Sequence, residues 1–532
     1  MRIFLLTGLF FYCNLISAQR DERFPAIDVL HYTFNIGLND DNNNIQGLAI
    51  VSIHMLQTIP SFNLDIVKKN SSGKGMLVKS VKENGSPVSF LQEADYIHIY
   101  TATRAGDTVS YIITYEGIPA DGLIIDKNKY GHRGFFGDNW PNRAHNWLPC
   151  VDNPADKASV DFIVTAPDHY QVVANGLQTE ETNLPGQLKL THWKETVELP
   201  TKVMVIGVAD FAVNYAGNID CIPVYSWVYP ENKSTGFYDY AQALDILPWF
   251  IKNVGPYAYK KLANVQSKTQ FGGMENASAI FYYENSVKGN RSEESLLAHE
   301  IAHQWFGNSA TEASWPHIWL SEGFATYMTH LYLENRYGID TLQKRLVDDR
   351  QTVIAFAKKR FTPIVDSSVG TDYFPLLNAN SYQKGGWVLH MLRRKLGDTL
   401  FWQGIRNYYA QYAGKNASTE DLQKVMEATS GQDLTVFFKQ WLFTAGHPVL
   451  QTKQLYDKKN KKLSIDIEQM QSGIFSFPLT IQIEAADGKS NNTIEVKDKK
   501  TSLVFEGVKP PYKIILDPFV NLLFEEASKA IK

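Results

Sequence analysis

Residues 299–325 read HEIAHQWFGNSATEASWPHIWLSEGFA, and this stretch decides how the middle of the chain folds. Apolar residues at three- and four-residue spacing predict one helix over 292–306 and a second over 318–337. Gly307-Asn308 should end the first helix, and Trp315-Pro316 should mark the loop that follows it. Two antiparallel helices joined by such a loop would place the start of the second opposite the end of the first.

The first helix carries two histidines four residues apart, which places both imidazoles on one helix face. Glu322 stands early in the second helix within the mostly apolar segment 319–325, so we expect its carboxylate to be buried and to need a compensating partner. The pattern predicts one Zn²⁺ per chain, bound by His299, His303 and Glu322, with a fourth position for water. Glu300, between the histidines, can then take a proton from that water. The alternative interpretation is a solvated helix with two surface histidines.

A second motif precedes the histidine helix and reads Gly272-Gly273-Met274-Glu275-Asn276. Two glycines would let an extended substrate backbone approach closely, because glycine has no side chain to obstruct it. Glu275, next to them, could bind a cation. Alone these residues would be an ordinary turn; beside a zinc site we interpret them as substrate-binding.

Strand patterns on both sides of the helical part predict a multidomain α+β protein. Alternating apolar residues over 32–38 and 45–55 flank the Asx-rich segment 39–44, which predicts a β-hairpin. Further alternating segments predict a large antiparallel β domain over 19–214. The helical part covers 215–445, and the returning alternation over 446–532 favours a small β-sandwich.

Composition excludes several classes of protein. The chain has 532 residues, of which 44% are hydrophobic and 20% charged, so it can bury ordinary globular cores. A net charge of −4 lacks the basic excess of a nucleic-acid-binding protein. Three cysteines exclude a disulfide scaffold.

The first eighteen residues have the layout of a secretory signal peptide, with Arg2, an apolar run over 3–12 and Ala18 before the expected cut. An N-terminal membrane anchor or buried helix is the alternative, but the run is too short to span a bilayer. No later segment is apolar enough either, so we expect no stable membrane insertion. The sequence therefore predicts an exported protein, periplasmic or secreted.

The histidine motif, the eighteen residues that separate His303 from Glu322, and the Gly-Gly-Met-Glu-Asn segment together resemble the aminopeptidase N and leukotriene hydrolase family of gluzincin metallopeptidases. The resemblance extends over nearly all of the chain after residue 18, including 148–158, Tyr382-Gln383-Lys384-Gly385, and Gly397-Asp398 with Phe401. It implies a saddle-like β domain, a thermolysin-like, mostly α catalytic domain and a β-sandwich. The helical C-terminal domain of many members is not expected here.

The family resemblance also implies roles for individual residues. Tyr382 would be the catalytic tyrosine that donates to the oxyanion, and Glu275 would bind the free α-ammonium of the substrate. Many members place a Gln or Glu from the β domain near that ammonium, and counting back from Pro149 puts Trp140 at this position. Asp138 or Asn139 could compensate. We assign only structural roles to His317, His330 and His390.

These expectations favour a zinc aminopeptidase that acts on peptides with a free N-terminus. A thermolysin-like endopeptidase would share the zinc helices, but it would cleave N-blocked peptides and would have no need of the Gly-Gly-Met-Glu-Asn segment. A lipid epoxide hydrolase is a further alternative, because one branch of the family combines that reaction with peptidase activity. A non-enzymatic scaffold on this fold should have lost metal ligands, whereas all three ligands and Glu300 are present.

Overall fold

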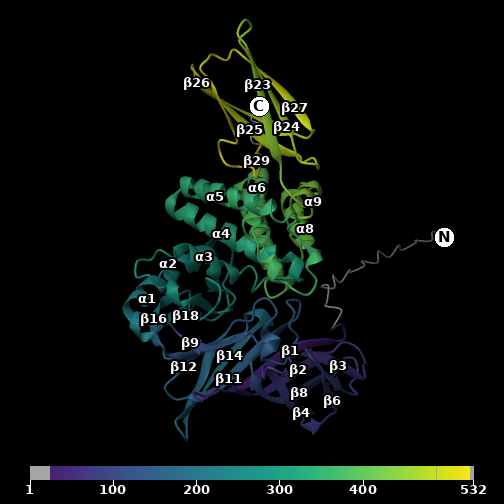
Figure 1. Ribbon diagram of the computed structural model, residues 1–532, viewed down its shortest axis with the longest axis vertical. Helices are drawn as coiled ribbons and strands as arrows, with labels where there is room; N and C mark the ends of the chain where they lie inside the picture. Colours follow the sequence, from purple (N-terminus) through teal and green to yellow (C-terminus); the bar gives the residue numbers. More distant parts are fainter. Residues whose placement is uncertain (1–23, 487, 528–532) are drawn as a thin grey trace, which may run out of the picture.

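A computed structural model of the chain describes residues 24–486 and 488–527 (Figure 1). A β-rich N-terminal region, a helical middle region and a β-rich C-terminal region follow one another along its longest axis. This arrangement confirms the predicted multidomain α+β architecture. The predicted signal peptide, residues 1–18, lies outside the described residues.

The N-terminal region is built around a sheet with the strand order β13-β14-β11-β1-β2-β8-β4-β5. Its strands are β1 (Ile27–Gly37), β2 (Ile45–Met55), β4 (Gly75–Glu83), β5 (Ser86–Pro87), β8 (Thr108–Ile118), β11 (Lys157–Pro167), β13 (Leu177–Leu184) and β14 (Leu188–Pro200). Buried and partly exposed residues alternate along β2, so one face of the sheet packs on the core. The predicted hairpin around 39–44 is confirmed, because β1 and β2 pair antiparallel on either side of it.

One strand pair departs from the antiparallel arrangement that the alternation suggested: β1 pairs parallel with β11. Parallel neighbours need a long crossover, and here the crossover contains strands of two smaller sheets. One small sheet contains β3 (Ser61–Asp65), β6 (Phe90–Gln92) and β7 (Tyr96–Tyr100), and the other β9 (Leu123–Lys127), β10 (Arg133–Gly137), β12 (Gln171–Ala174) and β15 (Ile206–Ala209).

The middle region begins with a sheet of order β16-β17-β18-β20-β19, which the sequence analysis did not predict. Every residue of β18 is buried, so this strand shows no alternation that could distinguish it from a buried helix. The strands are β16 (Ala212–Ile219), β17 (Ile222–Val228), β18 (Leu262–Ser267), β19 (Gly273–Met274) and β20 (Ala279–Tyr283).

Helices make up most of the remaining middle region. They are α1 (Lys233–Tyr240), α2 (Ala243–Asn253), α3 (Glu294–His303), α4 (Trp319–Tyr337), α5 (Ile339–Ala357), α6 (Gly385–Leu396), α7 (Asp398–Tyr412), α8 (Thr419–Ser430) and α9 (Thr435–Leu442). A π-helical turn, η8 (Asn380–Lys384), leads into α6, and a short parallel pair joins β21 (Thr311–Glu312) to β22 (Asn416–Ala417). No helix in the described part of the chain combines the length and apolar character needed to cross a bilayer.

The C-terminal region contains two facing sheets, as the sequence predicts. One has the order β27-β24-β23-β29 and the other β26-β25-β28. Inward residues such as Ile465 and Ile481 are fully buried between them. The strands are β23 (Val449–Asp457), β24 (Lys462–Gln469), β25 (Phe477–Ala485), β26 (Gly488–Val496), β27 (Lys500–Glu506), β28 (Lys513–Leu516) and β29 (Glu525–Glu526).

Buried polar contacts join the three regions. Lys202 of the N-terminal region forms a fully buried ion pair with Glu312, with Nζ and Oε1 2.6 Å apart. Arg350 on α5 reaches the C-terminal region, where its Nη2 donates to Asp517 Oδ2 at 2.8 Å and to the carbonyl oxygen of Leu522 at 2.6 Å. The middle region is therefore joined by buried polar contacts to both the N-terminal and the C-terminal region.

Candidate active site

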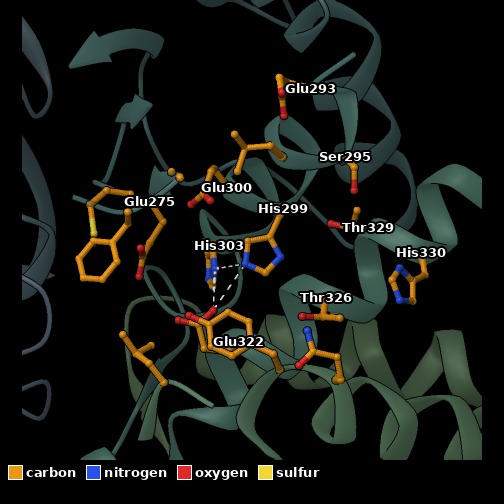
Figure 2. Close-up of a pocket in the computed structure, with 18 of the residues that line it drawn as sticks. Glu275, Glu293, Ser295, His299, Glu300, His303, Glu322, Thr326, Thr329 and His330 are labelled. Carbon is orange, nitrogen blue, oxygen red and sulfur yellow. Dashed lines mark hydrogen bonds and ion pairs between the residues drawn. The ribbon is translucent and has the colours of Figure 1, made fainter. Parts of the chain in front are cut away.

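Three potential metal-binding atoms converge where α3 meets α4 (Figure 2). The Nε2 atoms of His299 and His303 lie 3.1 Å apart. Glu322 Oε2 lies 3.5 Å from the first of these atoms and 3.3 Å from the second. Tetrahedral zinc with bonds of about 2.0–2.1 Å separates its donors by about 3.3 Å, so the three side chains fit this ion.

The orientation of His303 is fixed by the turn that ends α3. Its Nδ1 lies 3.1 Å from the carbonyl oxygen of Phe306 and 3.0 Å from Ser321 Oγ. A carbonyl oxygen only accepts, so Nδ1 carries the proton and the Nε2 lone pair is directed at the cluster. Gly307 allows this turn: it has φ +114°, and a Cβ there would lie 2.1 Å from Ser321 Oγ.

The cluster carries more negative than positive charge. The carboxylates of Glu275, Glu300 and Glu322 are all buried around the two imidazoles. Burial raises the pKa of Glu275 and of Glu300, and the neighbouring carboxylates raise both further. Glu275 Oε1 is buried and accepts no hydrogen bond from any described residue. Such a group of carboxylates is stabilised by a cation, in agreement with the donor geometry.

The absence of a side chain at Gly273 leaves the space that the Glu300 carboxylate occupies. A Cβ at Gly273 would lie 2.3 Å from Glu300 Oε1, whereas one at Gly272 would meet only Leu296, at 3.9 Å. The sequence analysis attributed both glycines to substrate approach alone. The structure adds that Gly273 makes room for the carboxylate that follows His299.

Four of the five residues of the Gly-Gly-Met-Glu-Asn segment line the pocket beside the histidines. The carbonyl oxygen of Glu275 accepts hydrogen bonds from Gln304 Nε2 at 2.8 Å and from Asn308 Nδ2 at 2.6 Å, which fixes the backbone of this segment. The prediction differs from the structure at Asn276, which is fully buried and does not line the pocket. A residue two positions after β19 turns its side chain into the protein interior.

Tyr382 lies on the π-helical turn η8 and lines the same pocket. Its ring stacks on that of His299, with centroids 6.0 Å apart and planes inclined by 12°. Burial and the nearby carboxylates raise the pKa of Tyr382 well above its usual value, so its hydroxyl keeps the proton that it can donate. Gly323 and Gly385 allow this placement, because a Cβ on either would lie about 3 Å from the Cα of the other.

The pocket has a volume of about 570 Å³, and its two ends differ in character. The end near Glu275 is lined by Trp140, Phe271 and Met274. On the other side of the histidine pair, Figure 2 shows Thr326, Thr329 and His330. An apolar end and a polar end therefore flank the candidate metal site.

Trp140 occupies the pocket wall, as counting back from Pro149 suggested, but neither neighbour compensates for it. Asn139 Nδ2 donates to the carbonyl oxygens of Met204 at 2.6 Å and Thr201 at 3.1 Å. Asp138 pairs with Arg143 at 3.2 Å and accepts from the backbone N–H of Gln270. Neither side chain lines the pocket, because these contacts hold the loop that presents Trp140.

Sequence reasoning missed the polar end of the pocket. His317 and His390 bond to Thr419 and Tyr327, away from the pocket, but His330, to which we gave only a structural role, lines it. The signal was available, since positions four, seven and eight after Glu322 share its helix face. Arg345 and Asp349 on α5 complete this end, and only tertiary packing places them there.

Comparison with known proteins agrees with this geometry. Residues 29–203 match the profile described as Peptidase M1 N-terminal domain, and residues 238–441 match Peptidase family M1 domain. Aminopeptidase M1 of Arabidopsis thaliana is 26% identical over 450 residues, which are 79% of this chain and 50% of the relative. Leucyl aminopeptidase of Saccharolobus solfataricus is 23% identical over 82% of this chain and 57% of its own length. The chain spans about half the length of the curated relatives it matches.

Two solved structures share the fold. A Legionella pneumophila aminopeptidase A in complex with aspartic acid superposes with a TM-score of 0.81 at 16% identity, over 95% of this chain and 60% of that one. A point mutant of an M1 zinc metallopeptidase from Deinococcus radiodurans gives 0.68 at 23% identity, over 80% of this chain and 96% of that one. At these identities the structural likeness supports the fold alone.

Proposed function

Because the chain belongs to peptidase family M1, we propose that it is a zinc-dependent aminopeptidase that removes the first residue from peptides with a free N-terminus. The observation that carries this proposal is the convergence of His299, His303 and Glu322 beside a buried, unpaired carboxylate oxygen of Glu275. One Zn²⁺ held by these three ligands would lower the pKa of a water molecule to about 7 and polarise the scissile carbonyl. We also propose that residues 1–18 direct export to the periplasm or the exterior.

The residues of this chain then divide the chemistry between them. Glu300 accepts a proton from the attacking water and returns it to the leaving amine, a role suited to a buried carboxylate with a raised pKa. The Tyr382 hydroxyl donates to the oxygen on which negative charge develops. Glu275 binds the substrate ammonium and so positions the first peptide bond at the candidate metal site.

The exopeptidase assignment predicts a strict requirement for a free amine. The ammonium would form a charge-assisted hydrogen bond with Glu275, whose Oε1 has no other described partner. Acetylation removes that charge and adds bulk where the substrate should end. We therefore expect cleavage of leucyl-naphthylamide but not of its N-acetyl form, and we expect Glu275→Ala to lower kcat/KM for the free amine roughly tenfold or more.

Fluorescence assays on both substrates measure this preference. Glu420→Ala provides a control, because Glu420 is exposed on α8 and lies outside the pocket. A thermolysin-like endopeptidase would show the reverse behaviour. Efficient internal cleavage of an N-acetylated peptide, unchanged by Glu275→Ala, would reject the aminopeptidase assignment.

Tyr382→Phe tests the oxyanion role, because it removes one hydroxyl and keeps the ring that stacks on His299. Loss of one such donor costs about 2.7–4 kcal/mol, a decrease of roughly a hundred- to a thousandfold in kcat. KM should change little, since the hydrogen bond strengthens mainly in the transition state. Steady-state kinetics measure both constants, and a decrease in kcat smaller than about threefold would leave Tyr382 with a packing role only.

A further inference from the structure

The polar end of the pocket is formed by two neighbouring helices. Thr326, Thr329 and His330 follow Glu322 along one face of α4, and Figure 2 shows them on the side of the histidine pair away from Glu275. Arg345 and Asp349 line the pocket from α5. Asp349 contacts His330 at this end, and Arg345 lies one helical turn before Asp349 on the same helix face. If Glu275 binds the ammonium, the part of the substrate that leaves must lie at this end.

Arg345 brings a positive charge to this end without a partner for it. The side chain is partly buried, and its guanidinium forms no hydrogen bond or ion pair with any residue in the described part of the chain. Two other arginines of the helical region do have carboxylate partners. Arg350 bonds to Asp517, and Arg393 bonds to Asp398 and Glu334. A guanidinium remains charged at any physiological pH and presents donors suited to a carboxylate.

Asp349, which lies one helical turn after Arg345 on α5, is already engaged. Asp349 Oδ2 lies 2.7 Å from His330 Nε2, and this pair connects α5 to α4. The other ring nitrogen of His330, Nδ1, is buried without a hydrogen bond to any described residue. Glu293 also lines the pocket, but Figure 2 places it at the margin, beyond Ser295 and away from Glu322. The charges of Asp348, Asp349 and Glu294 act on Arg345, but none of these carboxylates forms a hydrogen bond or ion pair with its guanidinium. The hydrogen-bond donors of Arg345 therefore remain available to a ligand.

We propose that Arg345 binds a carboxylate on the leaving part of the substrate and so selects peptides with negative charge just after the cleaved bond. This inference rests on the proposed aminopeptidase function, which fixes the direction of the peptide in the pocket. The carboxylate has two sources: the side chain of an acidic second residue, or the C-terminus of a dipeptide. Arg345 is thus a specificity-determining residue and takes no part in the hydrolysis itself.

Four substrates that begin with leucine separate these two sources. Leu-Glu-NH₂ and Leu-Gln-NH₂ differ only in a side-chain charge, and Leu-Gly and Leu-Gly-NH₂ differ only in a terminal charge. For the zinc-loaded wild-type protein we expect kcat/KM to favour the charged member of at least one pair by roughly ten- to a hundredfold, the usual range for a hydrogen bond to a charged group. The pair that shows the preference identifies the source.

Arg345→Gln should bring the preferred ratio to within about twofold of one, and the matched control Lys344→Gln should leave it unchanged. Lys344 precedes Arg345 on α5, is exposed, and does not line the pocket. Equilibrium binding to the Glu300→Gln variant adds a readout that needs no turnover. There the Kd of the charged peptide should rise by the same factor when Arg345 is also replaced.

Two results would overturn the inference. One is equal kcat/KM within both pairs for the wild-type protein, and the other is a charge preference that survives Arg345→Gln. A preference for Leu-Lys-NH₂ over Leu-Gln-NH₂ would also reject it, since Asp349 would then be the anchor. Failure of the proposed function is distinguishable, because leucyl-naphthylamide, which has no carboxylate, would then not be cleaved by any form of the protein.

Discussion

Glu300→Gln is expected to lower kcat by roughly a hundred- to ten-thousandfold, the contribution typical of a general base, while the protein keeps its zinc. The amide has nearly the shape of the carboxylate but cannot accept the proton of the attacking water. Glu300 is not one of the donors of the His299, His303 and Glu322 group, so a metal ion held by that group should not depend on its charge. Stopped or continuous peptide assays give kcat, and elemental analysis of the same sample gives zinc per chain.

Glu420→Gln serves as the matched control, because Glu420 is exposed on α8 and lies outside the pocket. Both variants should show the same circular dichroism and the same zinc content as the wild type. Wild-type turnover in Glu300→Gln would show that another group accepts the proton. Loss of zinc together with turnover would show that Glu300 is a ligand and that the donor assignment is wrong.

His299→Ala is expected to abolish both zinc binding and turnover. The substitution leaves two of the three converging atoms, His303 Nε2 and Glu322 Oε2, which are 3.3 Å apart. Two ligands hold zinc far more weakly than three, so dialysis against a mild chelator should leave the variant with little metal. Wild-type protein treated in the same way should keep about one zinc per chain.

His317→Ala controls for the loss of a histidine as such, because His317 bonds to Thr419 and lies outside the pocket. It should retain both zinc and activity. The opposite pattern, with zinc retained in His299→Ala and lost in His317→Ala, would contradict the assignment of His299 as a zinc ligand. A stronger chelator should inactivate the wild type reversibly, and activity should return when zinc is restored.

The sequence predicted those parts of the site that a single helix or helix pair specifies. His299 and His303 share a helix face through their spacing, and the apolar surroundings of Glu322 required a buried partner for it. The burial of Asn276 outside the pocket lining was not foreseen, because a five-residue motif does not reveal which side chain of a turn faces inward. Arg345 was missed because its position depends on how α5 packs against α4, and nothing in its local sequence distinguishes it from a surface arginine.

In the fold, too, local features were predicted from the sequence, whereas features that depend on distant segments were not. The alternation around 39–44 predicted a hairpin, since both strands and their turn are local. The parallel pairing of β1 with β11 joins segments separated in the sequence by all the strands from β2 to β10. Period-two alternation is the same for parallel and antiparallel neighbours, so it could not reveal this pairing. Strands buried on both faces, such as β18, lose the alternation altogether.

The hydrogen bonds from Arg350 to Asp517 and Leu522 make the β-sandwich mechanically continuous with the pocket wall. Arg350 directly follows Asp349, so a shift of the 517–522 loop would be transmitted to the helix that carries Arg345. Exchange of the sandwich with that of a relative is therefore expected to alter the substrate preference that we propose for Arg345. During evolution, positions 350 and 517 should covary, and drift in the sandwich should be slowest at this loop.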